Sequence, residues 1–344
     1  MKNLENTIKT IVLSFLVIIL TFGGNVYATD ENTYQYELEK KYIMEYLSLK
    51  ENVIFDIKDP IELYDSEENP AFLCFSLNDK GYIIINRYDF SIPEYSLRNS
   101  NVFLNSKKKI YYDGPLNYLE LSGEELIDAK SGMVLSTIDE FKIKSRLEMN
   151  DKLSINEKLK KIDTLMEYKE IYRTETEPIV LSHKLETYDY NPDGRCGSVA
   201  TAILLQYYDN NINESYVPDR YDYENGLINH LVPYIEGTSM GSTPEELKNG
   251  LNDYLDDQNI INPANLYSYS ISRIKSKIDS DRPIIVDLNN HSTYNEHWVV
   301  AHGYNIVDKI ILPDIVTVIV NDGWGNNDIN IDPANIGKLV YLDD

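Results

Sequence analysis

The feature that most constrains this chain is a cysteine placed where a loop becomes an amphipathic helix, within the stretch DGRCGSVATAILLQYYD. Cys196 lies between Gly194 and Gly197, which leave the backbone around the sulfur uncrowded. The residues at helical spacing after it are Val199, Ala202, Ile203 and Gln206, so we expect a helix that starts within a residue or two of Cys196. Unpaired backbone N–H groups and the helix dipole favour a nucleophilic thiolate there. The alternative is a small buried core residue.

Three apolar runs late in the chain predict a sheet. They are RPIIVDLN, EHWVVAHGY and IVTVIVNDGW, and each has the length and composition of a strand. Before them, Thr243, Pro244 and Glu246 predict the start of a helix with a capping box. The predicted buried side of that helix consists of Leu247, Leu251, Tyr254 and Leu255. A shorter helix is expected over Ile271–Ile278, and helices followed by a sheet indicate an α+β fold.

The first half of the chain predicts a second mixed region. A helix is expected over 37–49, two strands joined by a turn over 71–88, and further strand and turn material over 110–121 and 127–137. A charged helix follows, and its apolar residues on one side are Ile155, Leu159, Ile162 and Met166. The pattern breaks around 174–178, so we place a domain boundary there and expect domains at 29–175 and 176–344.

Residues 1–28 have the pattern of an export signal. Lys2 and Lys9 precede a 12-residue apolar run from Ile11 to Phe22, and Val26-Tyr27-Ala28 supplies small residues for cleavage. That run is short for a membrane span, and no other stretch approaches the ~20 residues that one requires. The sequence therefore predicts a secreted protein without a membrane span.

The net charge of −24 excludes nucleic acid as an expected partner, because like charges repel. Only two cysteines occur, Cys74 and Cys196, which is too few for a disulfide framework. A bridge between them remains an alternative that would disable the thiol. Cys74 lies in an alternating strand and is expected to be a packing residue.

The catalytic hypothesis needs a base near Cys196 and a group that orients the base. His297 begins a predicted strand, and Asn321 and Asp322 end the next one, where either could accept from the imidazole. Trp324 could shield that hydrogen bond from water. His291 and His302 lie near His297, but alternation places His302 on the opposite face, and no metal-binding motif occurs. We therefore expect no metal and no cofactor, and expect His183, His230 and His302 to be ordinary histidines.

The segments GRCGSVATA, HWVVAHGY and VNDGWG, in that order, resemble the papain-like cysteine peptidase superfamily. The likeness is to its bacterial secreted branches, the streptopain-type proteases and the double-glycine leader peptidases of the C39-like kind. It implies an α+β domain with the cysteine at the N-terminal end of a central helix and an antiparallel sheet carrying the histidine and an Asp or Asn. It also implies Cys196 as nucleophile, His297 as base and acid, and either Asp322 or Asn321 as orienter.

One departure from that family concerns the oxyanion donor. A glutamine is usual about six residues before the nucleophile, but this chain has Tyr190 there, with Asn191 beside it. Asn191 and the backbone N–H of Cys196 are the expected donors, and one such donor is typically worth ~10²–10³ in rate.

The upstream stretch CFSLNDKGYIIINRYDFSIPEYSL resembles the hairpin of streptopain-type pro-segments. The resemblance implies that residues 29–175 form a smaller α+β pro-domain that inhibits the enzyme. An accessory domain without an inhibitory role is the alternative.

The leading hypothesis is a secreted cysteine peptidase, made as a zymogen, that cleaves a peptide or protein substrate through a thioester intermediate. Two alternatives stay open. One is a non-catalytic secreted binding protein that keeps the peptidase fold. The other is a transglutaminase-like acyl transferase that uses the same three residue types.

Overall fold

The computed structural model describes most of the chain outside its first 35 residues. The described ranges are 36–51, 55–78, 80–99, 108–139, 152–171, 178–188, 190–191, 194–221, 223, 225–237, 241–288, 297–307, 314–343. The predicted export signal and His291 lie outside these ranges, and so does the predicted boundary segment 172–177.

Across the described ranges, one sheet of 15 strands runs through the molecule. In order of pairing the strands are β10 (Ala264–Ser268), β15 (Ile336–Leu342), β11 (Ile284–Leu288), β12 (His297–Val307), β13 (Ile315–Asn321), β14 (Ile329–Ile331), β4 (Glu94–Ser96), β3 (Gly81–Asn86), β2 (Phe72–Leu77), β1 (Ile61–Tyr64), β5 (Ile110–Tyr112), β6 (Tyr118–Ser122), β7 (Glu125–Asp128) and β8 (Val134–Thr137), with β9 (Ile179–Val180) beside β12. Strands β1 and β5 pair in parallel, whereas the other pairs are antiparallel.

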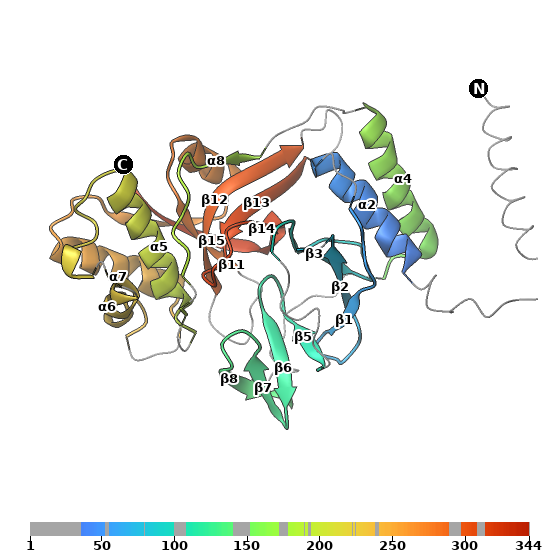
Figure 1. Ribbon diagram of the computed structural model, residues 1–344, viewed down its shortest axis with the longest axis horizontal. Coiled ribbons are helices and arrows are strands. Elements are labelled where there is room, and N and C mark those ends of the chain that lie inside the picture. The colour runs from blue at the N-terminus through green and yellow to red at the C-terminus, as the bar shows by residue number, and fades with distance from the viewer. Residues whose placement is uncertain are drawn as a thin grey trace, which may run out of the picture. The chain divides into compact units, whose positions relative to one another are not determined.

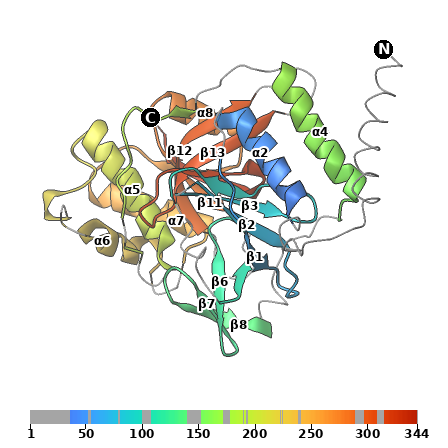
Figure 2. The same cartoon turned by 45° about the vertical axis from the view of Figure 1, so that its right-hand side comes forward.

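The same ranges contain six α-helices. They are α2 (Glu37–Glu51), α4 (Ile155–Ile171), α5 (Cys196–Asn211), α6 (Gly226–Ile235), α7 (Pro244–Asp257) and α8 (Ile271–Asp279). Helix α5 packs against β11, β12 and α6, and α6 packs against α7 (Figures 1 and 2). The mixed helix and sheet composition agrees with the expected class, and it is compatible with a peptidase domain.

Helix α5 is the core helix of this group. It starts at Cys196, as the sequence predicts, and 12 of its 16 residues are buried. A helix that is apolar on nearly every side must be surrounded by other elements. The neighbouring α7 begins with the predicted capping box, and its predicted apolar side is buried.

The N-terminal strands and helices form largely where the sequence predicts them, but one face of α4 differs. Ile162 and Leu165 are buried, whereas three residues predicted to share a face with Ile162 are exposed, namely Ile155, Leu159 and Met166. The reason is the way α4 docks, because Lys158 and Lys161 donate to the backbone carbonyls of Arg87 and Asp89. These contacts turn the Ile162 side of the helix inward.

Strands from the two predicted domains meet directly. Strand β14 pairs with β4 through the Ile329–Ser96 to Ile331–Glu94 register, and Leu38–Asp344 form one compact unit. The division at residue 175 stays a prediction. The sequence did not predict helix α6 or the strands β1, β4, β9, β10, β14 and β15.

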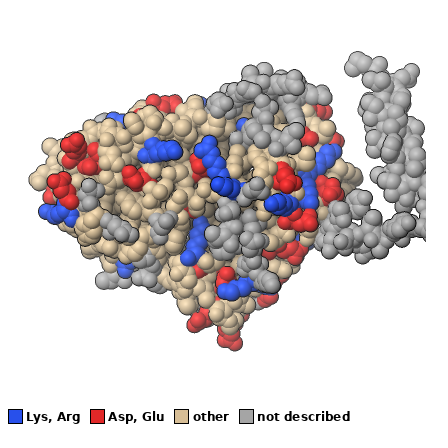
Figure 3. Space-filling model, viewed as in Figure 1, with Lys and Arg blue, Asp and Glu red and all other residues tan. Residues whose placement is uncertain are grey.

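The surface carries both signs of charge. Acidic and basic side chains are interspersed among other residues on the face in Figure 3. No helix within the described ranges combines the length and the apolar composition that crossing a membrane requires.

Candidate active site

The start of α5 lies against the start of β12. Cys196 is the first residue of the helix and is 7% exposed. Its thiol is hydrogen-bonded by the backbone N–H of Trp298, the second residue of the strand. His297 directly precedes Trp298 and is half-buried. The fold therefore brings Cys196 next to the strand end that carries His297, although 101 positions separate them in sequence.

The protonation state of the thiol differs from the prediction. Burial raises the pKa of Cys196 to about 12, and the charge of Glu236 adds to this effect. The N–H groups of Trp298, Gly197 and Cys196 itself act in the opposite direction, but they do not outweigh burial. The expected thiolate is therefore wrong for this state of the protein, in which the thiol is neutral at neutral pH.

Strand register separates the two candidates for the orienting residue. The last pair between β12 and β13 is Val300 with Asn321, and Asp322 directly follows the end of β13. Side chains two apart on a strand share a face, which puts Asp322 on the His297 side and Asn321 on the other side.

The carboxylate of Asp322 is fully buried and densely hydrogen-bonded. Its Oδ2 accepts from Lys130 Nζ at 3.2 Å and from Asn326 Nδ2 at 2.8 Å. Its Oδ1 accepts from the backbone N–H of Trp324 at 2.8 Å and of Asn326 at 3.0 Å. Burial would raise the pKa of Asp322, but the Lys130 charge and these hydrogen bonds hold it below the usual value. Trp324 is half-buried, and shielding by its indole ring stays a prediction.

The side chain of Asn321 holds backbone segments together. Its Nδ2 donates to the carbonyl of Glu186 at 3.1 Å and to the side chain of Asn327, and its Oδ1 accepts from the Gly323 N–H at 2.8 Å. Asn327 in turn donates to the carbonyl of Leu185 at 3.2 Å. Asn321 therefore ties the segment before Cys196 to the end of β13.

A turn of the N-terminal region reaches the site from outside. Lys130 and Met133 lie between β7 and β8, and Lys130 forms the ion pair with Asp322. The Met133 methyl group lies 2.8 Å from the position that a Cβ on Gly194 would take, and Gly194 has a φ of 68°. The turn thus contacts both Asp322, the predicted orienter, and the loop two residues before Cys196, the predicted nucleophile.

The predicted oxyanion donor is buried beside the same loop. Asn191 is 5% exposed, and its Nδ2 lies 4.0 Å from the Cβ position of Gly323. No donor among the described residues meets its Oδ1. Tyr190, at the position of the usual glutamine, instead directs its hydroxyl to Asn229 Oδ1 at 3.2 Å.

The other predicted histidines and cysteine have separate surroundings. A ring nitrogen of His302 contacts the Asn327 carbonyl, and burial lowers the pKa of His302. The His230 ring stacks on the Tyr221 ring with 3.8 Å between their centres, and His183 is exposed. Cys74 is fully buried in β2. Both cysteines are free, so the alternative of a disulfide between them is wrong. The described residues contain no group of three or more potential metal ligands.

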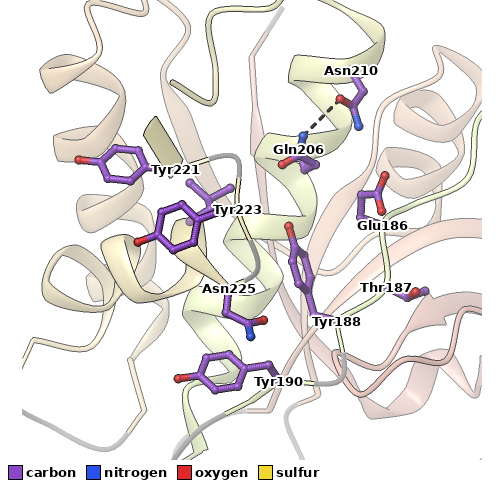
Figure 4. A pocket seen from close by; sticks show the side chains of 10 residues that line it. Glu186, Thr187, Tyr188, Tyr190, Gln206, Asn210, Tyr221, Tyr223 and Asn225 are labelled. Atoms are coloured by element: carbon purple, nitrogen blue, oxygen red, sulfur yellow. Dashed lines mark hydrogen bonds between the residues drawn. The ribbon is translucent and has the colours of Figure 1, made fainter. Parts of the chain in front are cut away.

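A tyrosine-lined cavity of about 680 Å³ lies along α5 (Figure 4). Its lining includes Tyr188, Tyr190, Tyr221 and Tyr223, with Gln206 and Asn210 of α5. Gln206 lies ten residues beyond Cys196, or about 15 Å along the helix. No function could be predicted for these tyrosines from the sequence, because only the fold gathers them.

Two residues that contact the predicted site, Lys130 and Glu236, could not be found from any local sequence pattern. Lys130 is 192 positions from Asp322, and Glu236 accepts the N–H of Ser198 at 2.8 Å from 38 positions away. Neither belongs to a local motif, and their proximity follows from tertiary packing alone.

Comparison with known proteins finds a family match over this region. Residues 179–342 match the model of the Peptidase_C39 like family. This range contains Cys196, His297, Asn321 and Asp322, and the match supports a cysteine peptidase-type domain. No curated protein matches the chain.

Proposed function

We propose that this chain is a cysteine peptidase in which Cys196 is the nucleophile, His297 the base and acid, and Asp322 the residue that orients His297. The observation that carries the proposal is the hydrogen bond from the Trp298 N–H to the Cys196 thiol. It places the strand end bearing His297 at the N-terminal end of α5. The family match over 179–342 supports the same chemistry.

The reaction follows from these positions. His297 takes the thiol proton, and the Cys196 sulfur attacks the carbonyl carbon of the peptide bond. The backbone N–H of Cys196 and the Asn191 amide donate to the oxyanion that forms. His297 then gives its proton to the leaving amine, which leaves a thioester, and water hydrolyses this to the acid while the proton returns to the thiol.

Asp322 is the better candidate for the orienter than Asn321. It shares a face with His297 by register, and its negative charge would stabilise the imidazolium that forms in the reaction. The amide of Asn321 already holds Glu186 and Asn327. Asp322 is held by Lys130, so it acts on His297 most strongly after that contact is released.

The N-terminal region is proposed to keep the enzyme latent. Lys130 holds the orienter, Met133 packs on the loop before Cys196, and the thiol is neutral. These features support the proposal of a zymogen whose residues 29–175 inhibit the catalytic domain. Export is part of the proposal and rests on the signal pattern of residues 1–28, so the N-terminus of exported protein should follow Ala28.

Replacement of the nucleophile is the main test of the function. Cys196→Ala should lower peptide hydrolysis by at least about 10³-fold, because no other described side chain replaces the thiol as nucleophile. Cys74→Ala is the matched control, since it removes the other cysteine from the buried strand β2. Hydrolysis by purified full-length and processed protein would be measured by release of a fluorescent leaving group. Equal loss in both variants, or hydrolysis by Cys196→Ala, would contradict the assignment.

Release of the ion pair tests latency. Lys130→Met should increase hydrolysis and thiol alkylation in the full-length chain, because Asp322 then loses its competing partner. Lys109→Met is the control, because Lys109 pairs with Glu68 at 2.9 Å on the surface of the same region. If Lys130→Met is unfolded, because the Asp322 charge is left buried, Met133→Ala opens the Gly194 side instead. Rates equal to wild type in folded variants would count against an inhibitory contact.

A non-catalytic binding protein is the second candidate, and the neutral thiol and Tyr190 favour it. It predicts peptide binding with no hydrolysis and no rapid alkylation of Cys196, even after residues 29–175 are removed. Incorporation of an added amine without net hydrolysis would instead favour the acyl transferase.

A further inference from the structure

The first turn of α5 lacks a local cap. Arg195 occupies the N-cap position and makes no side-chain capping hydrogen bond. The orphan N–H groups of a first turn must find acceptors, and a buried one without a partner is costly. Here the acceptor comes from the end of α6, 38 positions away in sequence.

That acceptor is the carboxylate of Glu236, which is 4% exposed. Its Oε1 accepts the backbone N–H of Ser198 at 2.8 Å, and its Oε2 accepts the Ser198 hydroxyl. The backbone N–H of Glu236 donates to the carbonyl of Val232 at 3.0 Å, which fixes the residue at the end of its own helix.

Close packing around Gly197 brings the Glu236 carboxylate next to the helix turn that begins with Cys196. A Cβ at Gly197 would lie 2.6 Å from Ser242 Oγ and 3.1 Å from Glu236 Oε1, so only glycine leaves this space. The carbonyl of Ser242 accepts the indole N–H of Trp298 at 3.0 Å. The same Trp298 donates its backbone N–H to the Cys196 thiol, so Glu236 and Ser242 belong to the shell that holds the sulfur.

The carboxylate opposes the electrostatics expected of this position. A helix N-terminus favours an anion, and here Glu236 and the Cys196 sulfur compete for the same positive end. Among the described residues, the other charged and titratable groups near this end of α5 include Arg195, His297, Asp322 with Lys130, and Asp287, which is fully buried in β11 and pairs with Trp298. Burial raises the pKa of Glu236 overall, although the hydrogen bonds from Ser198 and the charge of Arg195 act to lower it. Burial also raises the pKa of the Cys196 thiol, and the charge of Glu236 adds to that effect.

We propose that Glu236 is a positioning residue that fixes the first turn of α5 beneath Cys196 and limits the reactivity of the sulfur in the resting enzyme. The role rests on the proposed function, in which Cys196 is the nucleophile. It assigns to one carboxylate both the placement of the sulfur and a limit on its reactivity in the resting enzyme.

The test compares glutamine variants of two capping glutamates in the full-length Cys74→Ala chain, where Cys196 is the only thiol. Glu236→Gln keeps an acceptor for the Ser198 N–H and removes the charge. It should move the pH midpoint of iodoacetamide alkylation downward and increase the rate at neutral pH by about tenfold. Glu246→Gln makes the same change at the cap of α7 and should leave the profile unchanged.

Three outcomes decide the proposal. A lower midpoint in Glu236→Gln alone supports it, whereas a lower melting temperature with an unchanged midpoint shows a merely structural cap and overturns it. If Glu236→Gln does not fold, Glu236→Asp replaces it in the test, because the shorter side chain moves the charge away by one methylene. An alkylation midpoint in Glu236→Asp no lower than in the wild type then overturns the proposal. Alkylation needs no peptidase activity, so these results are separate from a failure of hydrolysis in the wild-type enzyme.

Discussion

Two helices of the same cluster begin in opposite ways. Helix α7 begins with a local capping box, in which Thr243 N donates to Glu246 Oε2 at 2.8 Å and Thr243 Oγ1 accepts from the Glu246 N–H at 3.3 Å. Both partners are exposed and lie three residues apart. Helix α5 begins without such a box, and its capping carboxylate is buried and comes from the end of α6.

The difference shows how each helix start is used. A local cap stabilises its own helix and depends little on the rest of the fold. The distant cap of α5 exists only when α6 is docked, so the position of Cys196 depends on packing between two helices. Because the cap comes from α6, the N-cap residue of α5 is Arg195, which makes no capping hydrogen bond, and Cys196 occupies the first position of the helix. The helix start that carries the proposed nucleophile is therefore held from outside, whereas the start of α7 carries its own cap.

The largest expected effect that sharpens this comparison is on stability. Glu236→Ala leaves the buried N–H and hydroxyl of Ser198 without their acceptors, so it should lower the free energy of unfolding by about 2–4 kcal/mol. Glu246→Ala removes an exposed cap partner and should cost only about 0.5–1 kcal/mol. Urea unfolding at neutral pH, followed by circular dichroism, measures both values. Similar losses in the two variants would mean that the distant cap is no more important than the local one.

Local patterns in the sequence predicted much of the fold. The start of α5 at Cys196 and the capping box of α7 follow from residues within one turn of each other, and both are confirmed. The strands that carry His297 and Asn321 are also confirmed, because apolar runs of this length bounded by polar residues have few other solutions. Helix α6 was missed, since Pro233 lies inside it and interrupts the helical pattern.

The electrostatics of the site could not be predicted in the same way. The sequence indicated a thiolate from the unpaired N–H groups and the dipole of the helix start, but burial of Cys196 and the charge of Glu236 act against it. The Lys130 contact with Asp322 joins residues 192 positions apart. Such effects depend on which distant groups the fold brings together, and one sequence carries no local sign of them.

A smaller effect distinguishes the two caps by the sign of their pH dependence. Burial raises the pKa of Glu236 above its usual 4.5, so this group binds its proton more tightly in the folded state. Its contribution to stability is therefore present at low pH and is lost as the pH rises through the raised value. The hydrogen bonds from Thr243 lower the pKa of Glu246, so its contribution is present above 4.5 and is lost as the pH falls.

Unfolding of the wild type, Glu236→Gln and Glu246→Gln between about pH 4 and pH 8 should therefore give opposite slopes. The advantage of the wild type over Glu236→Gln should shrink as the pH rises, because the variant has no buried charge to form. Its advantage over Glu246→Gln should shrink as the pH falls, and by less, because that carboxylate is exposed and screened by solvent. Slopes of the same sign would mean that Glu236 is effectively solvated, and that the distinction between a buried and an exposed cap does not hold.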